Sequence, residues 1–355
     1  MKTMLERAKG SPLDITIKSL DPIGTITLLP PHATQIRALN FEHIYWTKIQ
    51  SVLEINSGPL PLLRVLRIIV IEEFNLGGPH ATTPPTLPLF TNAVNLREFY
   101  LHSEGSPFIG HFAFPNLTRF ELVATPAEAG FRASLLDFLK ASPTLQIVHL
   151  KIVGDMPLEG LPRQRVVLLP NVEVFTMVAD DGGPGYEIAA HISCPSAKHT
   201  SLVHERDAYN ITQEMFPNPV SWNAIARQYT RGPVEEVTLE INTAYDTLIS
   251  CSLTFQSPDT SVLALDYKVA GDEDDPAFPF EEMHCEVFSG ASRTIQEHPL
   301  LASVKCIHIN HRLPVSGFNG SERIVEDAGR LFKSIGPLDK LTIYNSDPLD
   351  RKSVV

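Results

Sequence analysis

Residues 115–122 read Pro-Asn-Leu-Thr-Arg-Phe-Glu-Leu, with apolar residues two, five and seven positions after the proline. The same pattern returns in residues 143–150, Pro-Thr-Leu-Gln-Ile-Val-His-Leu, and in residues 170–177, Pro-Asn-Val-Glu-Val-Phe-Thr-Met. The three copies begin 28 and 27 residues apart. Self-similarity at a period of about 20–50 residues is typical of repeat proteins, which stack one supersecondary unit many times. The sequence therefore predicts a repeat architecture.

Weaker copies of this apolar triplet extend the pattern along most of the chain, at irregular spacings of 21 to 42 residues. The last two apolar positions of each triplet alternate with other residues, as on one face of a β-strand. The first lies three residues earlier, in the turn before the strand, where a preceding proline ends any helix. The weaker copies begin at Ile36, Leu63, Leu96, Ala197, Val234, Val262, Val304 and Leu338.

Segments between the triplets show the spacing of amphipathic helices. The clearest covers residues 324–335, with Ser321 as the predicted N-cap and Gly336-Pro337 as the end of the helix. Similar stripes occur over residues 45–53, 131–139 and 222–229. Each unit is thus predicted to run strand, loop, helix, turn, which makes the fold class α/β.

The composition narrows the possible partners. The 355 residues carry a net charge of −12 and contain no Lys/Arg-rich run, so we expect neither nucleic acid nor an anionic membrane surface as a partner. The four cysteines form no CxxC pair, and the first residues show no apolar signal segment. These features favour a cytoplasmic or nuclear protein.

No sequence motif indicates catalysis, a cofactor or a metal. His308 and His311 lie three apart on a predicted strand and so would face opposite sides. The acidic run Asp272–Asp275 lacks the order of a calcium loop. Gly182–Gly185 lacks the Lys-Ser/Thr of a phosphate loop, and we predict that these residues form a flexible turn. We predict a protein that is not an enzyme; an enzyme with a dispersed active site stays a weaker alternative.

The Pro-led triplet resembles a divergent leucine-rich repeat, although the asparagine or cysteine that follows the strand in that family is mostly missing here. Residues 5–17, Leu-Glu-Arg-Ala-Lys-Gly-Ser-Pro-Leu-Asp-Ile-Thr-Ile, are similar to the segment that joins the F-box to the repeats in basidiomycete F-box/leucine-rich-repeat proteins. The strand at residues 36–41, the helix carrying Trp46 and Leu53, and Pro61-Leu62-Leu63-Arg64-Val65-Leu66 match the same family.

This resemblance implies an irregular leucine-rich-repeat-like solenoid, with parallel strands on the concave face and helices and loops on the convex face. We expect residues 1–20 to be a cap remnant after a missing F-box, 21–346 the solenoid and 347–355 a flexible tail. The family implies the substrate-recognition part of a cullin-RING ubiquitin ligase receptor, or a truncated relative. A cullin-RING adaptor is expected only if an F-box exists upstream, and the protein target is unknown. The alternative is a repeat scaffold without any ubiquitin-ligase link.

In such a solenoid, the residues beside the last two apolar positions face the concave side. Arginine, tyrosine and histidine are favoured as anchors at interfaces. We therefore predict a protein-binding surface formed by Arg67, Tyr100, His102, Arg119, Glu121, His149 and Lys151.

Overall fold

The computed structural model describes residues 10–18, 27–45, 60–71, 93–103, 109, 112, 114–125, 130–154, 166–180, 183–207, 219–229, 233–244, 248–257, 262–270, 280–297, 303–311, 321–335 and 337–345. The chain forms two compact units, Met1–Val172 and Glu173–Val355. Each unit mixes α and β structure around a mostly parallel sheet. The expected α/β class is therefore confirmed.

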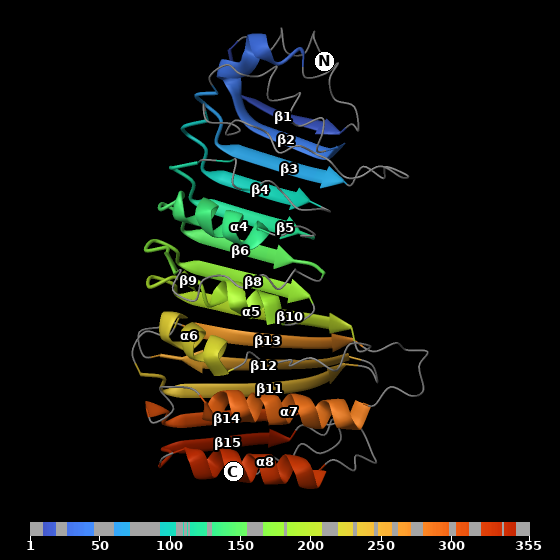
Figure 1. Cartoon of the computed structure of the whole chain (residues 1–355), viewed down its shortest axis with the longest axis vertical. Coiled ribbons are helices and arrows are strands. Elements are labelled where there is room, and N and C mark those ends of the chain that lie inside the picture. The colour runs from blue at the N-terminus through green and yellow to red at the C-terminus, as the bar shows by residue number, and fades with distance from the viewer. Residues whose placement is uncertain are drawn as a thin grey trace. The chain divides into compact units, whose positions relative to one another are not determined.

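Unit 1 builds its sheet in the order of the chain, β1-β2-β3-β4-β5-β6, and every neighbouring pair is parallel (Figure 1). Its strands are β1 (Leu13–Lys18), β2 (Ile36–Tyr45), β3 (Val65–Ile71), β4 (Glu98–Ser103), β5 (Arg119–Ala124), β6 (Ile147–Ile152) and the short β7 (Val167–Leu168). A 3-10 helix, η1 (Pro30–Gln35), and one α-helix, α4 (Phe131–Lys140), complete its described elements. The predicted strands at these triplets and the helix at 131–139 are confirmed.

One face of the unit 1 sheet forms an aromatic core. Phe99 on β4 lies with its ring centroid 4.9 Å from that of Phe112 and 5.1 Å from that of Phe114. Phe120 on β5 and Phe138 on α4 are 4.6 Å apart, so α4 packs on this same face of the sheet. Because strand residues alternate between faces, the residues between these aromatic side chains project from the opposite face.

A ladder of side-chain hydrogen bonds joins the turns that precede the strands of unit 1. Each polar side chain donates to a carbonyl of the previous turn, which satisfies a backbone acceptor that no strand reaches. The donors and acceptors are Asn95 to Pro61 (2.7 Å), Asn116 to Val94 (2.8 Å), Thr144 to Pro115 (3.0 Å) and Asn171 to Pro143 (3.0 Å). We call these four donors the turn ladder. The asparagine that usually follows the strand in leucine-rich repeats is mostly missing from this sequence. In the structure, the asparagine or threonine in the turn before the strand links neighbouring turns instead.

Unit 2 departs from the order of the chain. Its strands are β8 (Val174–Asp180), β9 (Ile192–Ser193), β10 (His199–Asp207), β11 (Glu236–Ala244), β12 (Leu248–Gln256), β13 (Val262–Ala270), β14 (Cys306–His311) and β15 (Lys340–Asn345). The sheet order is β8-β10-β13-β12-β11-β14-β15, and β12 is antiparallel to both of its neighbours.

The prediction of consecutive parallel strands is therefore wrong for residues 236–270. β10 pairs with β13 and not with β11, the next long strand along the chain. β12 has no Pro-led triplet and was not predicted. Only three residues separate β11 from β12 and five separate β12 from β13, and connections this short suit antiparallel hairpins and not parallel crossovers.

The described residues of unit 2 include the helices α5 (Gly183–Ala189), α6 (Pro219–Tyr229), α7 (Phe280–Gln296) and α8 (Ser321–Ser334). The helices predicted near 222–229 and 324–335 are confirmed. Residues 182–185 were predicted as a turn, but α5 begins at Gly183, and α7 was not predicted at all. Beyond Tyr45, the helix predicted over residues 45–53 lies outside the described residues, as do 272–275 and 347–355.

Candidate functional site

Four of the seven predicted binding residues form one row across unit 1. Arg67 on β3 lies opposite Tyr100 on β4, Tyr100 lies opposite Glu121 on β5, and Glu121 lies opposite His149 on β6. Opposed residues of neighbouring strands project from the same face of a sheet. The parallel register thus brings together side chains that are up to 82 positions apart in sequence.

The other three predicted residues lie two positions from this row and so share its face. His102 and Lys151 both lie opposite Val123, and Arg119 lies opposite Glu98. Arg67 and His102 are exposed, whereas the remaining five are half-buried. We call these seven residues, Arg67, Tyr100, His102, Arg119, Glu121, His149 and Lys151, the Tyr100 face. The structure places all seven opposite the aromatic core.

Tyr100 is held in place by neighbours on both sides. Its hydroxyl donates a 2.6 Å hydrogen bond to Glu98 Oε2, and the Arg119 guanidinium carbon lies 5.5 Å from the centroid of its ring. Arg119 Nη2 is also 3.6 Å from Glu121 Oε2. A cation within about 6 Å of an aromatic face is attracted by the ring. Tyr100 is therefore presented as an ordered anchor.

Burial, and then the hydrogen bond to the Glu98 carboxylate, raise the pKa of Tyr100 to about 12. The phenol therefore stays protonated at neutral pH and keeps donating to Glu98. The prediction from sequence missed Glu98. Its signal was present, because Glu98 precedes Tyr100 by two positions and so shares its face of the strand.

The surroundings of His149 on the Tyr100 face change the pKa of its imidazole. Burial first, and then the positive charge of Arg119, lower its pKa below the usual value, while Glu121 acts in the opposite direction. The imidazole is consequently neutral at pH 7, with one ring nitrogen able to donate and the other able to accept a hydrogen bond.

The first two strands of unit 1 carry charges that are already paired. Arg37 on β2 forms a two-pronged ion pair with Asp14 on β1, one contact of which is 2.9 Å. Lys18 Nζ lies 2.7 Å from Glu42 Oε2, and this hydrogen bond lowers the pKa of Glu42. These pairs satisfy their own charges, so the Tyr100 face, on β3 to β6, offers the more distinctive chemistry.

Within the described ranges, no three His, Cys, Asp or Glu side chains come together as a metal site. His308 Nε2 on β14 lies 3.8 Å from Glu236 Oε1 on β11, which is a long polar contact across neighbouring strands.

No protein-family model matches this chain, and no curated protein matches it. Among the helices of the described part of the chain, none combines the length and the apolar character needed to cross a bilayer.

Proposed function

We propose that the Tyr100 face binds a partner protein and that the chain is not an enzyme. The observation that carries this proposal is the parallel register that gathers seven side chains on one face of β3 to β6. Tyrosine and arginine are enriched among the residues that contribute most to protein–protein binding. The hydrogen bond to Glu98 and the Arg119 contact order Tyr100 before binding, which reduces the entropy lost on association.

The size of the Tyr100 face suits the centre of an interface. Three strand spacings of about 4.8 Å and two double steps along a strand give roughly 14 by 13 Å. This area of about 180 Å² is a fraction of the roughly 800 Å² that each partner buries in a standard interface. A bound protein would therefore also contact residues around the Tyr100 face.

We further propose that unit 1 is a segment of a leucine-rich-repeat-like solenoid with the Tyr100 face on its concave side. The strands in chain order and the turn ladder support this reading. Together with the N-terminal resemblance, they favour the recognition part of an F-box-type ubiquitin ligase receptor, or a truncated relative of one.

The test of binding is tagged affinity purification from the source cells with the wild type and the double variant Tyr100→Ala/Arg119→Ala. We expect recovery of the main partner to fall at least tenfold, because each hot-spot side chain contributes about 1–2 kcal/mol or more. The melting temperature should fall by a few degrees at most. The control Thr176→Ala/Thr254→Ala changes two half-buried sheet residues of unit 2. Equal recovery with Tyr100→Ala/Arg119→Ala and with wild type would contradict the proposal.

The ligase part has a separate test. The 355-residue chain and a version extended by the coding sequence upstream are purified in parallel and probed for the cullin adaptor. Adaptor bound to the extended chain supports a ligase receptor. If neither version binds the adaptor, the ligase assignment is wrong, whereas the proposed binding face is unaffected.

A further inference from the structure

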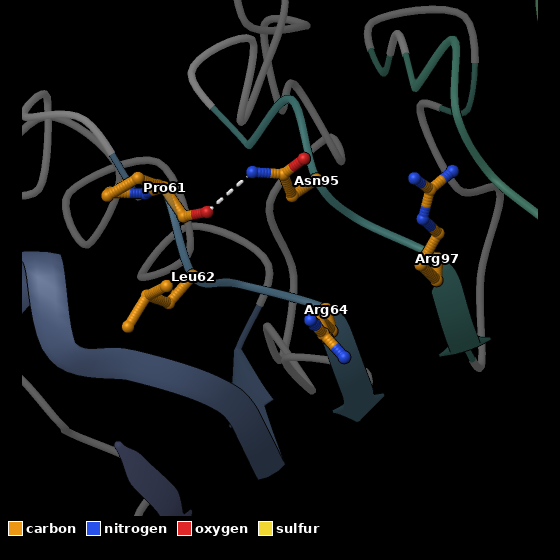
Figure 2. A pocket seen from close by; sticks show the side chains of 5 residues that line it. All are labelled: Pro61, Leu62, Arg64, Asn95 and Arg97. Carbon is orange, nitrogen blue, oxygen red and sulfur yellow. Dashed lines mark hydrogen bonds between the residues drawn. The ribbon is translucent and has the colours of Figure 1, made fainter. Parts of the chain in front are cut away.

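A pocket of about 300 Å³ opens beside the turns that precede β3 and β4. Its lining residues are Pro61, Leu62, Arg64, Asn95 and Arg97 (Figure 2). Asn95 donates to the Pro61 carbonyl across this pocket at 2.7 Å, which fixes one wall through the turn ladder. The volume lies at the lower end of the range of about 300–1,000 Å³ for small-ligand sites.

Two arginine side chains, those of Arg64 and Arg97, line this pocket from neighbouring turns (Figure 2). The Arg97 amide donates to the Arg64 carbonyl, and the Arg64 amide donates to the Arg37 carbonyl, each at 2.8 Å. Arg37, near the start of β2, and Arg64 and Arg97, in the turns before β3 and β4, therefore occupy the same register position in three successive repeats. Neighbouring strands lie about 4.8 Å apart. The next two turns carry the uncharged Thr118 and Gln146 at this position, so the run of arginines ends at the pocket.

The three arginines differ in how their charge is satisfied. Arg37 is paired with Asp14. Arg97 donates from Nη1 to the Asn116 carbonyl, a neutral acceptor, at 2.8 Å. Among the described residues, no carboxylate pairs with Arg64 or Arg97, and no acidic residue lines the pocket. A phosphate held between the two side chains would give each guanidinium a charged acceptor.

We infer that this pocket binds a phosphate monoester, with the phosphate between Arg64 and Arg97 and its organic group against Pro61 and Leu62. Two guanidinium charges match a phosphate monoester, which carries a charge of about −1.5 to −2 at pH 7. Guanidinium forks fit phosphate oxygens in two-pronged geometry. Leu62 is 43% exposed, which leaves its apolar surface available to the ester group.

The site is tested by isothermal titration calorimetry of the full chain with phenyl phosphate, inorganic phosphate and phenol. Phenyl phosphate should bind more tightly than inorganic phosphate, and phenol should not bind. Arg64→Gln and Arg97→Gln should each weaken phenyl phosphate binding about tenfold, since a charged hydrogen bond is lost. The double variant should show no binding.

Two further variants separate binding from folding. Arg37→Gln occupies the same position one turn earlier but lies outside the pocket lining, so binding should be unchanged. Leu62→Glu leaves both arginines intact and places a negative charge at the apolar wall, so binding should be lost. Since all four residues are exposed, namely Arg37, Leu62, Arg64 and Arg97, we expect the four single variants to keep the wild-type circular dichroism spectrum.

A final arm identifies the source of the phosphate. A short alanine-flanked phosphotyrosine peptide is compared with its unphosphorylated form and with phenyl phosphate. Tighter binding of the phosphopeptide would assign the site to a phosphate carried by a protein, and tighter binding of phenyl phosphate would assign it to a free ester. No saturable heat with any phosphate at millimolar concentration, or equal binding to the double variant, would overturn the inference. Neither result bears on partner capture by the Tyr100 face.

Discussion

Unit 1 and unit 2 pair parallel strands in the same way but differ in how the chain fills the sheet. In unit 1 each strand lies beside the previous long strand of the chain, from β1 to β6. In unit 2 the hairpin-like run β11-β12-β13 enters the sheet in reverse order, so that β10 pairs with a strand 63 residues further on. Local repetition therefore determines the neighbours in unit 1, whereas long-range pairing determines them in unit 2.

The polar faces of the two sheets differ as well. One row of unit 1 reads Arg67, Tyr100, Glu121, His149. A corresponding row in unit 2 runs through five small residues, Thr176, Ser201, Ala264, Thr254 and Thr238, before it reaches His308 on β14. Small hydroxyl side chains offer little contact area, whereas large aromatic and guanidinium groups provide most of the energy in interfaces. The large side chains that the proposed binding face needs therefore lie along the row of unit 1.

The largest expected effect, an all-or-none one, concerns the strand order of unit 2. Ser201 on β10 lies opposite Ala264 on β13, and neighbouring strands are about 4.8 Å apart, within the range of disulfide-bonded residues. The pair Ser201→Cys/Ala264→Cys should form a disulfide on mild oxidation, detected by peptide mass spectrometry.

The matched pair Ser201→Cys/Thr238→Cys joins β10 to β11, three strands away and about 14 Å distant. It should remain unlinked. A disulfide in this second pair would mean that β10 lies beside β11, as in a repeat with consecutive strands. The two units would then not differ in strand order.

The next largest effect concerns the aromatic core of unit 1. Phe99 is fully buried and contacts four other phenylalanine rings, so Phe99→Ala should lower the free energy of unfolding by about 3–5 kcal/mol. Denaturant titration measures the loss, and hydrogen exchange should report it in β4 to β6. Phe332→Ala, at a half-buried position of α8, should cost less. A larger cost for Phe332→Ala would show that Phe99 is not the centre of a core.

Alkaline pH should weaken unit 2 in particular. Burial raises the pKa of Tyr186, Tyr229 and Tyr267, and that of the Cys194 thiol to about 12. These groups keep their protons longer in the folded chain than in the unfolded chain. Above pH 9 for the thiol and above pH 10 for the phenols, the free energy of unfolding therefore falls as pH rises, by up to about 1.4 kcal/mol per group and pH unit.

The measurement is guanidinium unfolding at pH 8 and pH 11, followed by the fluorescence of the buried Trp222 in a Trp46→Phe background. Tyr186→Phe/Tyr267→Phe removes two of the ionisable groups and should reduce the alkaline loss. An unchanged loss in that variant would mean that other groups dominate.

The smallest expected effect concerns the turn ladder of unit 1. Asn116→Ala removes the 2.8 Å hydrogen bond to the Val94 carbonyl and should cost about 0.5–1 kcal/mol, the net contribution of one exposed hydrogen bond. Thermal unfolding measures the change. Gln146→Ala, at an exposed position of the next turn, should be near neutral. Equal melting temperatures for the two variants would argue against a stabilising ladder.

Unit 1 could be predicted from the sequence because its signals are local. Each of the strands β2 to β6 carries its own apolar triplet. The alternation of residues along these strands placed Tyr100 and Arg119 on one face. The proximity of Glu98 to Tyr100 could have been predicted, because residues two positions apart share one face of a strand. The alternation alone does not show that the Tyr100 hydroxyl donates to Glu98 and not to a carboxylate of a neighbouring strand.

Unit 2 was harder to predict because its strand order depends on long-range pairing. β12 alternates Ile249, Cys251, Leu253 and Phe255 toward the core, but nothing in that alternation reveals which strands pair with it. The signal for α7 was present and was missed, because its buried residues follow the spacing of a helix: Met283, Val287, Phe288, Ala291 and Ile295.

The turn ladder has a consequence for how this chain can change in evolution. Its bonds tie each turn to the previous one at the amino ends of the strands, while the units of unit 1 differ in length from 21 to 33 residues. Insertions and deletions between the end of one strand and the next turn therefore leave the register of the strands unchanged. A gain or loss of one residue between a turn and its strand would instead invert that strand's faces. Length variation can accumulate in the first kind of segment without moving Tyr100 or Arg119.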